Sequence, residues 1–225
     1  MKKKNLMGLV LAGVLAFAPA ASVCAEESQE TLVYGSGDYT RINPAMDEHG
    51  EINILIFNGL TAHDGDNQVV PGLAESWDFD EETCTYTFHL AENVKWHDGE
   101  PFTAEDVKFT LDMATGNMVA SILAGYVGCT VVDDYTIEIE IEKYNNEFIQ
   151  SLASVPLSIQ SKKAYDDGVE DPYYIGTGPY KFDEWVEGEY CRLVKVDDYW
   201  GNDLPADDNL APGVAETIEF RPYIE

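Results

Sequence analysis

Residues 86–109 read YTFHLAENVKWHDGEPFTAEDVKF, and this stretch carries the clearest structural pattern in the chain. Across residues 83–90, small or polar side chains alternate with the large side chains of Tyr86, Phe88 and Leu90. Alternation with a period of two residues is typical of a β-strand that buries one face. The pattern therefore predicts a strand here, in a sheet with one covered face.

The segment after this strand predicts a turn and then a helix. We expect a second short strand at 94–96 and a turn at 97–101, in which Gly99 can adopt a positive φ. Thr103 is suited to cap a helix that ends at Gly116, because its hydroxyl can accept a hydrogen bond from an early helix N–H. Two aromatic side chains of this segment are expected to pack inward, namely Trp96 and Phe102.

Short strands and short helices are spread along the rest of the chain, with turn residues between them. The apolar periodicity predicts strands at 31–36, 129–132, 135–142, 181–185, 190–196 and 217–220, and helices at 51–60 and 148–153. The sequence contains no internal repeat and no low-complexity linker. This mixture of elements predicts an α/β or α+β fold.

The composition is that of a globular protein with an unusual charge. Of the 225 residues 45% are hydrophobic, whereas disordered chains are poorer in apolar residues. Lys and Arg number 13 against 42 Asp and Glu, which gives a formal net charge of −29. Because such a field repels phosphate groups, we expect no nucleic-acid partner and no electrostatic docking to anionic membranes.

Residues 1–25 are predicted to be a secretory signal peptide. A basic start precedes an apolar run at 6–18, which is shorter than the roughly 20 residues that a membrane-spanning helix needs. Cleavage after Ala25 is favoured over lipidation of Cys24, since Val23 is a poor residue before a lipidated cysteine. Either route exports the protein, to the periplasm or to the outer face of the cytoplasmic membrane.

Catalytic motifs are absent from the sequence. There is no nucleophile elbow, P-loop or dinucleotide-binding fingerprint, and the four histidines form no HExxH pair. We therefore expect neither enzyme activity nor a cofactor, and an exported hydrolase is kept only as an alternative. His89 in a strand and His97 in a turn are expected to be structural.

Neither the cysteines nor the acidic residues at 64–68 predict a metal site. Cys84, Cys129 and Cys191 are widely spaced, so one disulfide is possible and the pair that would form it stays open. Residues 64–68 are similar to the start of a calcium loop, but Val69 stands where such a loop requires glycine. A solvated turn is therefore expected there.

Five short motifs follow one another along the chain. They are GL at 59–60, LAESW at 73–77, DGEPFTAEDV at 98–107, GTGPY at 176–180 and YWG at 199–201. In this combination the chain resembles the bacterial extracellular solute-binding proteins of family 5, the receptors of peptide, nickel and related ABC importers. The family commonly has arginine at the position of Ala91, and we expect this departure to affect local packing only.

The resemblance implies a periplasmic-binding-protein-like fold of type II, in which two lobes close on a ligand. Residues 26–60 and 175–225 would form lobe I, and residues 61–174 would form a subdomain inserted into it. The second ligand-binding lobe would follow beyond residue 225, so the resemblance covers the N-terminal part of a longer protein. Since one wall of a clamp supplies only part of the contacts, we expect the chain alone to bind ligand weakly.

The resemblance also implies which residues face the ligand. They are Met46, Glu48, His49 and Gly50 in one loop, Tyr34 and Ser36 at a strand end, and Tyr126. We expect a monomeric substrate-binding protein that delivers short peptides to the permease subunits of an ABC importer. A nickel or metal-chelate receptor of the same family, using His49, is the nearest alternative, and an acidic calcium-binding surface module is another.

Overall fold

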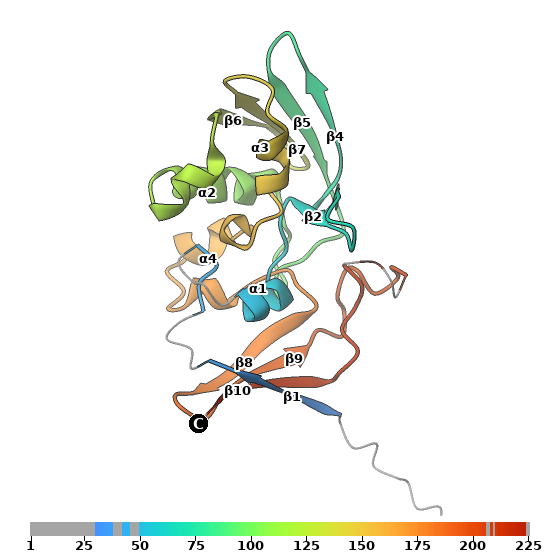
Figure 1. Ribbon diagram of the computed structural model, residues 1–225, viewed down its shortest axis with the longest axis vertical. Coiled ribbons are helices and arrows are strands. Elements are labelled where there is room, and N and C mark those ends of the chain that lie inside the picture. The colour runs from blue at the N-terminus through green and yellow to red at the C-terminus, as the bar shows by residue number, and fades with distance from the viewer. Residues whose placement is uncertain (1–29, 38–41, 46–49, 206–207, 209, 224–225) are drawn as a thin grey trace, which may run out of the picture.

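The computed structural model describes residues 30–37, 42–45, 50–205, 208 and 210–223 (Figure 1). Within these residues, two four-stranded β-sheets lie toward opposite ends of the long axis, and α1 and α4 lie between them. The predicted mixture of short strands and short helices is confirmed, and the fold is of the mixed α/β class.

One sheet, called the lobe sheet below, is built from segments near both ends of the chain. Its strand order is β1-β10-β9-β8, with bounds Thr31–Ser36 for β1, Thr217–Pro222 for β10, Tyr190–Lys195 for β9 and Tyr180–Val186 for β8. Strand β1 runs parallel to β10, whereas the other pairs are antiparallel. Helix α1 (Gly50–Ile56) packs Ile52 and Ile56 against Leu193 and Phe220 on one face. The four strands predicted for this region are confirmed.

Helix α1 ends four residues before the predicted end at residue 60. The amide oxygen of Asn58 accepts a hydrogen bond from the hydroxyl of Thr177 at 2.9 Å, which holds this segment against a distant part of the chain. A Cβ on Gly59 would lie 2.7 Å from the main-chain oxygen of Thr61. Tertiary contacts therefore stop the helix although its apolar periodicity continues.

The other sheet, called the subdomain sheet below, lies entirely within residues 74–141. Its order is β4-β5-β7-β6, all antiparallel, with bounds Ala74–Asp80 for β4, Thr85–Leu90 for β5, Thr136–Ile141 for β7 and Tyr126–Asp133 for β6. Helix α2 (Ala104–Thr115) covers its buried face, where Phe88, Leu111 and Ile137 are fully enclosed. The remaining elements are β2 (Thr61–His63), β3 (Val69–Pro71), α3 (Asn146–Ser151), α4 (Lys162–Asp166) and the 3-10 helices η1 (Met118–Leu123), η2 (Val155–Leu157) and η3 (Pro172–Tyr174).

Two features of the subdomain differ from the sequence prediction. The strand expected at 94–96 is absent, because the main chain of Trp96 is used in a turn, donating to Glu100 O and accepting from Gly99 N–H. Strand β4 was not predicted, since a register shift between Ala74 and Ser76 interrupts its alternation. The inward packing of the two aromatic side chains is confirmed, as Trp96 is 3% and Phe102 0% exposed.

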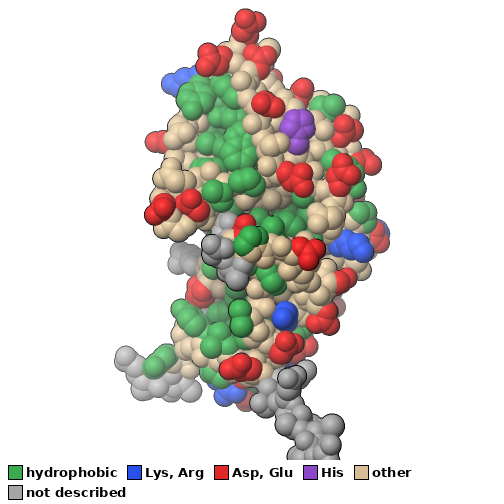
Figure 2. All heavy atoms as spheres, turned by 90° about the vertical axis from the view of Figure 1, so that its right-hand side faces the viewer, with side chains coloured by type: hydrophobic (Ala, Val, Ile, Leu, Met, Phe, Trp, Pro, Cys, Tyr) green, Lys and Arg blue, Asp and Glu red, His purple; other side chains and the backbone are tan. Residues whose placement is uncertain are grey.

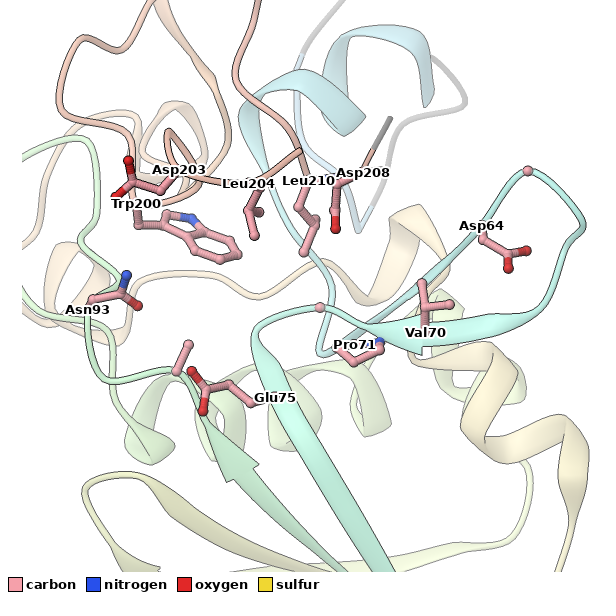
Figure 3. A pocket seen from close by; sticks show the side chains of 13 residues that line it. Asp64, Val70, Pro71, Glu75, Asn93, Trp200, Asp203, Leu204, Asp208 and Leu210 are labelled. Atoms are coloured by element: carbon pink, nitrogen blue, oxygen red, sulfur yellow. The ribbon is translucent and has the colours of Figure 1, made fainter. Parts of the chain in front are cut away.

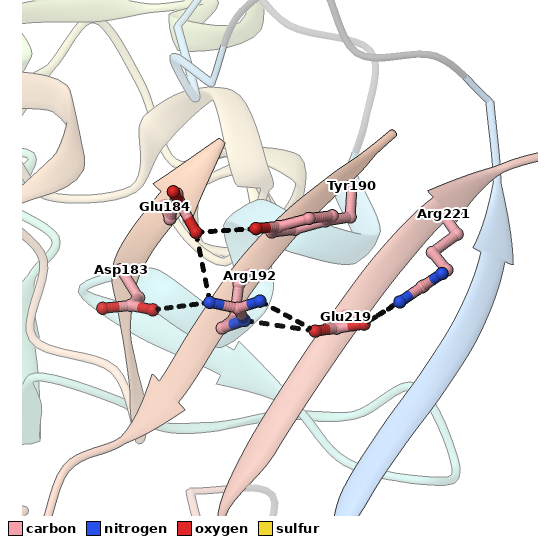
Figure 4. Close-up of polar contacts among 6 residues, drawn as sticks. All are labelled: Asp183, Glu184, Tyr190, Arg192, Glu219 and Arg221. Atoms are coloured by element: carbon pink, nitrogen blue, oxygen red, sulfur yellow. Dashed lines mark hydrogen bonds and ion pairs between the residues drawn. The ribbon is translucent and has the colours of Figure 1, made fainter. Parts of the chain in front are cut away.

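The face of the lobe sheet opposite α1 carries a charged network (Figure 4). Arg192 donates to Glu219 Oε1 and to Glu184 Oε2, each at 3.1 Å, and its guanidinium carbon lies 4.6 Å from the centre of the Tyr190 ring. Arg221 donates to the other oxygen of Glu219 at 2.6 Å. Hydrogen bonds from Arg221 and then Arg192 lower the pKa of Glu219. This face is therefore a polar surface, and the apolar residues of the sheet turn toward α1.

The three cysteines of the described residues are all free. Cys191 is buried on the inner face of β9, and this burial raises the pKa of its thiol to about 12. Cys84 and Cys129 are half-buried. The disulfide that the sequence left open is therefore not formed among the described residues.

A buried carboxylate ties three segments of the subdomain together. Asp106, in the first turn of α2, is 5% exposed. Its Oδ2 accepts from the main-chain N–H of Thr103 at 2.9 Å and from Trp96 Nε1–H at 3.4 Å, and its Oδ1 accepts from Lys162 N–H at 2.8 Å. Burial raises the pKa of the Asp106 carboxyl, and the bonds from the N–H groups of Thr103 and Lys162 oppose this rise. Thr103 is confirmed as the cap residue, and Asp106 links it to the start of α4.

The GTGPY segment makes a close main-chain contact with the end of α1. Gly178 N–H donates to Ile56 O at 2.8 Å. A Cβ on either Gly176 or Gly178 would overlap the carbonyl group of Ile56, a backbone group that cannot move aside. Only glycine permits this approach, so both glycines of the motif are required by packing.

His97 holds the same junction from the subdomain side. Its main-chain N–H donates to Gly176 O at 2.9 Å, its Nδ1 accepts from Gly176 N–H at 3.2 Å, and its Nε2 lies 2.9 Å from Gly178 O. Because Nδ1 accepts, the proton of the neutral ring is on Nε2, which donates to Gly178. Burial lowers the pKa of His97 from 6.5 to about 4. The residue is structural, in line with the sequence prediction, and it is needed in its neutral form.

Replacement of Asp106 by Asn is expected to lower the free energy of unfolding by about 2–3 kcal/mol, because an NH2 group would then face a buried N–H donor. Glu105→Gln, at the exposed neighbouring position of α2, is the matched control and should change stability by less than about 0.5 kcal/mol. Urea unfolding followed by circular dichroism measures both. Equal stability of the two variants would show that Asp106 does not hold the three segments.

Stability is expected to fall as the pH is lowered from 6.5 to about 4. In this window the unfolded chain binds a proton at His97 and the native chain does not, so protonation favours unfolding, by about 3 kcal/mol in total. His97→Gln should remove this part of the pH dependence. His89→Gln, at a histidine whose side chain is 48% exposed, should leave it in place.

Thermal unfolding of the three proteins across this pH range is the measurement. Should His97→Gln fail to fold, the ring resonances of the native protein give an independent answer. A His97 ring that titrates near its ordinary pKa in the native protein would contradict the conclusion that the junction needs a neutral His97.

Candidate functional site

The structure brings part of the predicted ligand loop next to the end of β1. Ser36, the last residue of β1, is 9% exposed, and its hydroxyl donates to Glu51 Oε1 at 3.1 Å. Gly50, directly before Glu51, begins α1. Two predicted site residues, Ser36 and Gly50, therefore lie at one corner of the lobe sheet. The others in that loop, Met46, Glu48 and His49, lie outside the described residues.

Tyr34 lies on the same strand, which forms the edge of the lobe sheet. Its ring is 48% exposed and its centre lies 5.4 Å from that of Phe220. Leu32 and Val33 are exposed to 53% and 56%. Among the described residues β1 pairs only with β10, so its other edge carries main-chain groups available to an extended chain. The corner thus offers a strand edge, an apolar surface and a hydroxyl.

Tyr126 belongs to a different part of the molecule. It begins β6 in the subdomain sheet and packs against the core of that sheet, whereas β1 lies in the lobe sheet at the other end (Figure 1). Its hydroxyl oxygen is buried without a hydrogen-bond partner among the described residues, and this burial raises the pKa of Tyr126. The structure does not bring Tyr126 together with Tyr34 and Ser36, and its binding role stays a prediction.

A large cavity lies between the β2–β3 hairpin and the chain after Trp200 (Figure 3). Its volume is about 710 Å³. The apolar lining consists of Val70, Pro71, Ala91, Trp200, Leu204 and Leu210, and the acidic lining consists of Asp64, Glu75, Asp203 and Asp208. None of these four carboxylates forms an ion pair with a Lys or Arg of the described residues. The cavity therefore suits neutral or cationic groups and disfavours anions.

Sequence reasoning missed this cavity for a topological reason. Its lining residues come from residues 64–75, residues 91–93, residues 200–204 and the two residues Asp208 and Leu210, which no local pattern connects. Trp200 is positioned by a hydrogen bond from its Nε1–H to Thr177 O at 2.9 Å. The GTGPY segment therefore also places one wall of the cavity. The YWG motif at 199–201 was the one sequence signal in this region, and it does not indicate where the indole of Trp200 points.

The acidic side chains form no metal centre in the described part of the molecule. Figure 2 shows them scattered over one face, around a broad apolar area and among few Lys or Arg side chains. No three His, Cys, Asp or Glu side chains of the described residues gather as metal ligands. In the predicted turn at 64–68, Asp64 Oδ1 accepts from the N–H groups of Asp66 at 2.9 Å and Gln68 at 2.8 Å. This is the hydrogen bonding of a solvated turn.

Across its described residues the chain has no helix with the length and apolarity that crossing a bilayer demands. The predicted signal peptide lies outside these residues.

Known proteins with similar sequences are transport proteins. The sequence profile of bacterial extracellular solute-binding proteins, family 5 Middle, matches residues 68–222. The dipeptide-binding protein of Escherichia coli (strain K12) is 31% identical over 98% of this chain and 46% of its own length. A putative ABC transporter peptide-binding protein of Brucella ovis is 34% identical over 66% of this chain and 30% of its own length.

Solved structures give the same assignment. The periplasmic binding protein DppA from Helicobacter pylori, in complex with peptide STSA, matches with a TM-score of 0.70 and 27% identity over 86% of this chain and 42% of its own. NikZ from Campylobacter jejuni, in complex with Ni(L-His), matches with a TM-score of 0.73 and 26% identity over 87% of this chain and 39% of its own. This chain spans less than half the length of these relatives.

These matches confirm the periplasmic-binding-protein-like fold expected from the motifs, over the part of that fold that this chain contains. The family profile covers more than half of the chain and includes the GTGPY segment and the His97 junction described above. The chain therefore belongs to the bacterial extracellular solute-binding proteins of family 5.

Proposed function

We propose that this chain is part of an extracytoplasmic substrate-binding protein that delivers short peptides to an ABC importer. The observation that carries the proposal is the 31% identity with the dipeptide-binding protein of Escherichia coli, which extends over 98% of this chain. The peptide-bound relative from Helicobacter pylori supports the same class of ligand. The protein would be exported, would bind its ligand without transforming it, and would act as a monomer on membrane permease subunits.

The corner of the lobe sheet supports a peptide ligand on physical grounds. An extended peptide can pair with the free edge of β1 through its main chain, whose groups do not depend on the peptide sequence. The half-exposed side chains of Leu32 and Tyr34 would cover part of the peptide. We propose that Tyr34, Ser36 and Gly50 contact the ligand from this side.

The proposed division of the chain follows the two sheets. Lobe I would comprise residues 26–60 and 175–225, whose described parts contribute all strands of the lobe sheet. The inserted subdomain would comprise residues 61–174, which contain the subdomain sheet and α2. A second ligand-binding lobe would close on this half in the complete protein.

A nickel-chelate receptor is the second candidate function. The relative NikZ, solved with Ni(L-His), is 26% identical over most of this chain. The candidate relies on His49, which lies outside the described residues. Peptide is the stronger candidate because the dipeptide-binding protein of Escherichia coli is 31% identical over 98% of this chain, against 26% over 87% for NikZ.

We expect the isolated chain to bind tripeptides with a dissociation constant weaker than about 10 μM, which corresponds to roughly −6.8 kcal/mol, because only one wall of the clamp is present. Nuclear magnetic resonance titration with Ala-Ala-Ala should shift the main-chain amide signals of β1 most. Ser36→Ala should weaken binding at least threefold, whereas Ser76→Ala, at an exposed position of β4, should not change it.

Parallel titrations with Ni²⁺ plus L-histidine and with Ca²⁺ separate the alternatives. Signals near Gly50 that respond to the nickel chelate and not to peptide would replace the peptide proposal by the second candidate. A response of the turn at 64–68 to Ca²⁺ alone would instead favour the calcium-binding module.

A further inference from the structure

A second, smaller pocket lies beside the turn at residues 42–45, close to the end of α2 and the start of α4. Its volume is about 100 Å³, and its polar lining consists of Asn43, Asn117, Gln160 and Tyr165. Apolar side chains complete the wall, and none of the lining residues is acidic. In a chain with 42 Asp and Glu residues, this is an uncharged polar site.

The amide oxygens of both asparagines are already used within the chain. Asn43 Oδ1 accepts from the main-chain N–H of Ala45 at 3.0 Å, and Asn117 Oδ1 accepts from that of Val119 at 2.9 Å. Each bond fixes the orientation of its amide and leaves the NH2 group as a donor. Neither NH2 group donates to a residue that the structure describes.

Gln160 contributes a buried NH2 group that lacks an acceptor among the described residues. It is 1% exposed, and its Oε1 accepts from the hydroxyl of Tyr165 at 2.7 Å. Its Nε2 is buried and has no hydrogen-bond partner within the described part of the chain. An unsatisfied buried donor costs about 1–3 kcal/mol, and native proteins rarely leave one without an acceptor.

The three amide side chains that line this pocket use their oxygens within the chain, so what they offer a ligand is NH2 donors, which select for a hydrogen-bond acceptor. A water molecule takes about 30 Å³ of liquid volume, so this pocket admits only a group of a few heavy atoms. A carboxylate or an amide carbonyl has both the size and the lone pairs that are required. The lack of acidic lining residues removes the repulsion that such a group would meet elsewhere on this protein.

We propose that this pocket binds a carbonyl or carboxylate oxygen of the peptide ligand, with Asn43, Asn117 and Gln160 as donors. The inference rests on the proposed function, because it takes the ligand to be a peptide. The turn at 42–45 belongs to the segment between β1 and α1, the two elements that hold Ser36 and Gly50.

The test uses substitutions that keep the internal hydrogen bond and remove only the donor. Asn117→Asp and Asn43→Asp retain the accepting Oδ1, and Asp is as good a cap residue as Asn. Asn146→Asp, at an exposed position, adds the same charge away from the pocket and is the matched control. Nuclear magnetic resonance of the ¹⁵N-labelled chain follows the side-chain NH2 signals of the three lining amides.

Acetate, acetamide and Ala-Ala-Ala with a free or an amidated C-terminus are titrated in turn, with sodium chloride as the control for ionic strength. We expect the three NH2 signals to shift with acetate or acetamide and with the tripeptide. Asn117→Asp and Asn43→Asp should each weaken tripeptide binding about tenfold, the scale of one lost hydrogen bond. Loss of binding on amidation identifies the terminal carboxylate as the bound group, and retained binding identifies a main-chain carbonyl.

The possible failures are distinguishable. If the tripeptide binds but the NH2 signals stay in place and both Asp variants keep their affinity, the pocket proposal is wrong and the peptide function stands. If acetate or acetamide shifts the NH2 signals while no peptide binds, the pocket is an acceptor site and the peptide function is wrong. No response to any of the four ligands overturns the pocket proposal.

Discussion

The contact of two glycines with the carbonyl group of Ile56 is the constraint on which the rest of the molecule depends. Gly176 and Gly178 approach this group so closely that no larger residue fits, and His97 binds the main chain of both glycines from the other side. The lobe sheet and the subdomain are thereby held in one relative position. Because Trp200 is also hydrogen-bonded to this segment, one wall of the large cavity depends on the same contact.

Two polar side chains explain the geometry of the DGEPFTAEDV segment: the partly buried His97, directly before it, and the buried Asp106 within it. His97 satisfies both ring nitrogens at the junction, and Asp106 accepts three N–H donors from separate segments. A fully satisfied buried polar group has few alternative arrangements, so it specifies geometry more narrowly than apolar packing does. The motif is therefore architectural: its residues fix where the chain turns, where α2 begins and how the two sheets meet.

The sequence predicted elements whose pattern is local and missed features that arise between distant segments. The strand at 31–36 and the helix capped by Thr103 follow from periodicity and capping, and both were found. Strand β4 escaped because a bulge breaks its alternation, and α1 ends early because Asn58 bonds a residue far along the chain. Both cavities lie between segments that no sequence window contains. Of the predicted ligand residues that the structure describes, Ser36 and Gly50 lie together, Tyr34 lies on the same strand as Ser36, and Tyr126 lies in the other sheet.

The charge of the chain gives the two cavities opposite preferences. At physiological ionic strength a charge acts over about 8 Å. The charges that line a cavity therefore influence which ligand group it accepts more than the net charge of −29 does. The large cavity has four carboxylates without basic partners among the described residues, and an anionic group would be repelled there. The small pocket has amide donors and no acidic residue. The proposed peptide ligand has one end of each charge, and the uncharged, donor-rich pocket would accept the end or the carbonyl that the acidic surface would otherwise repel.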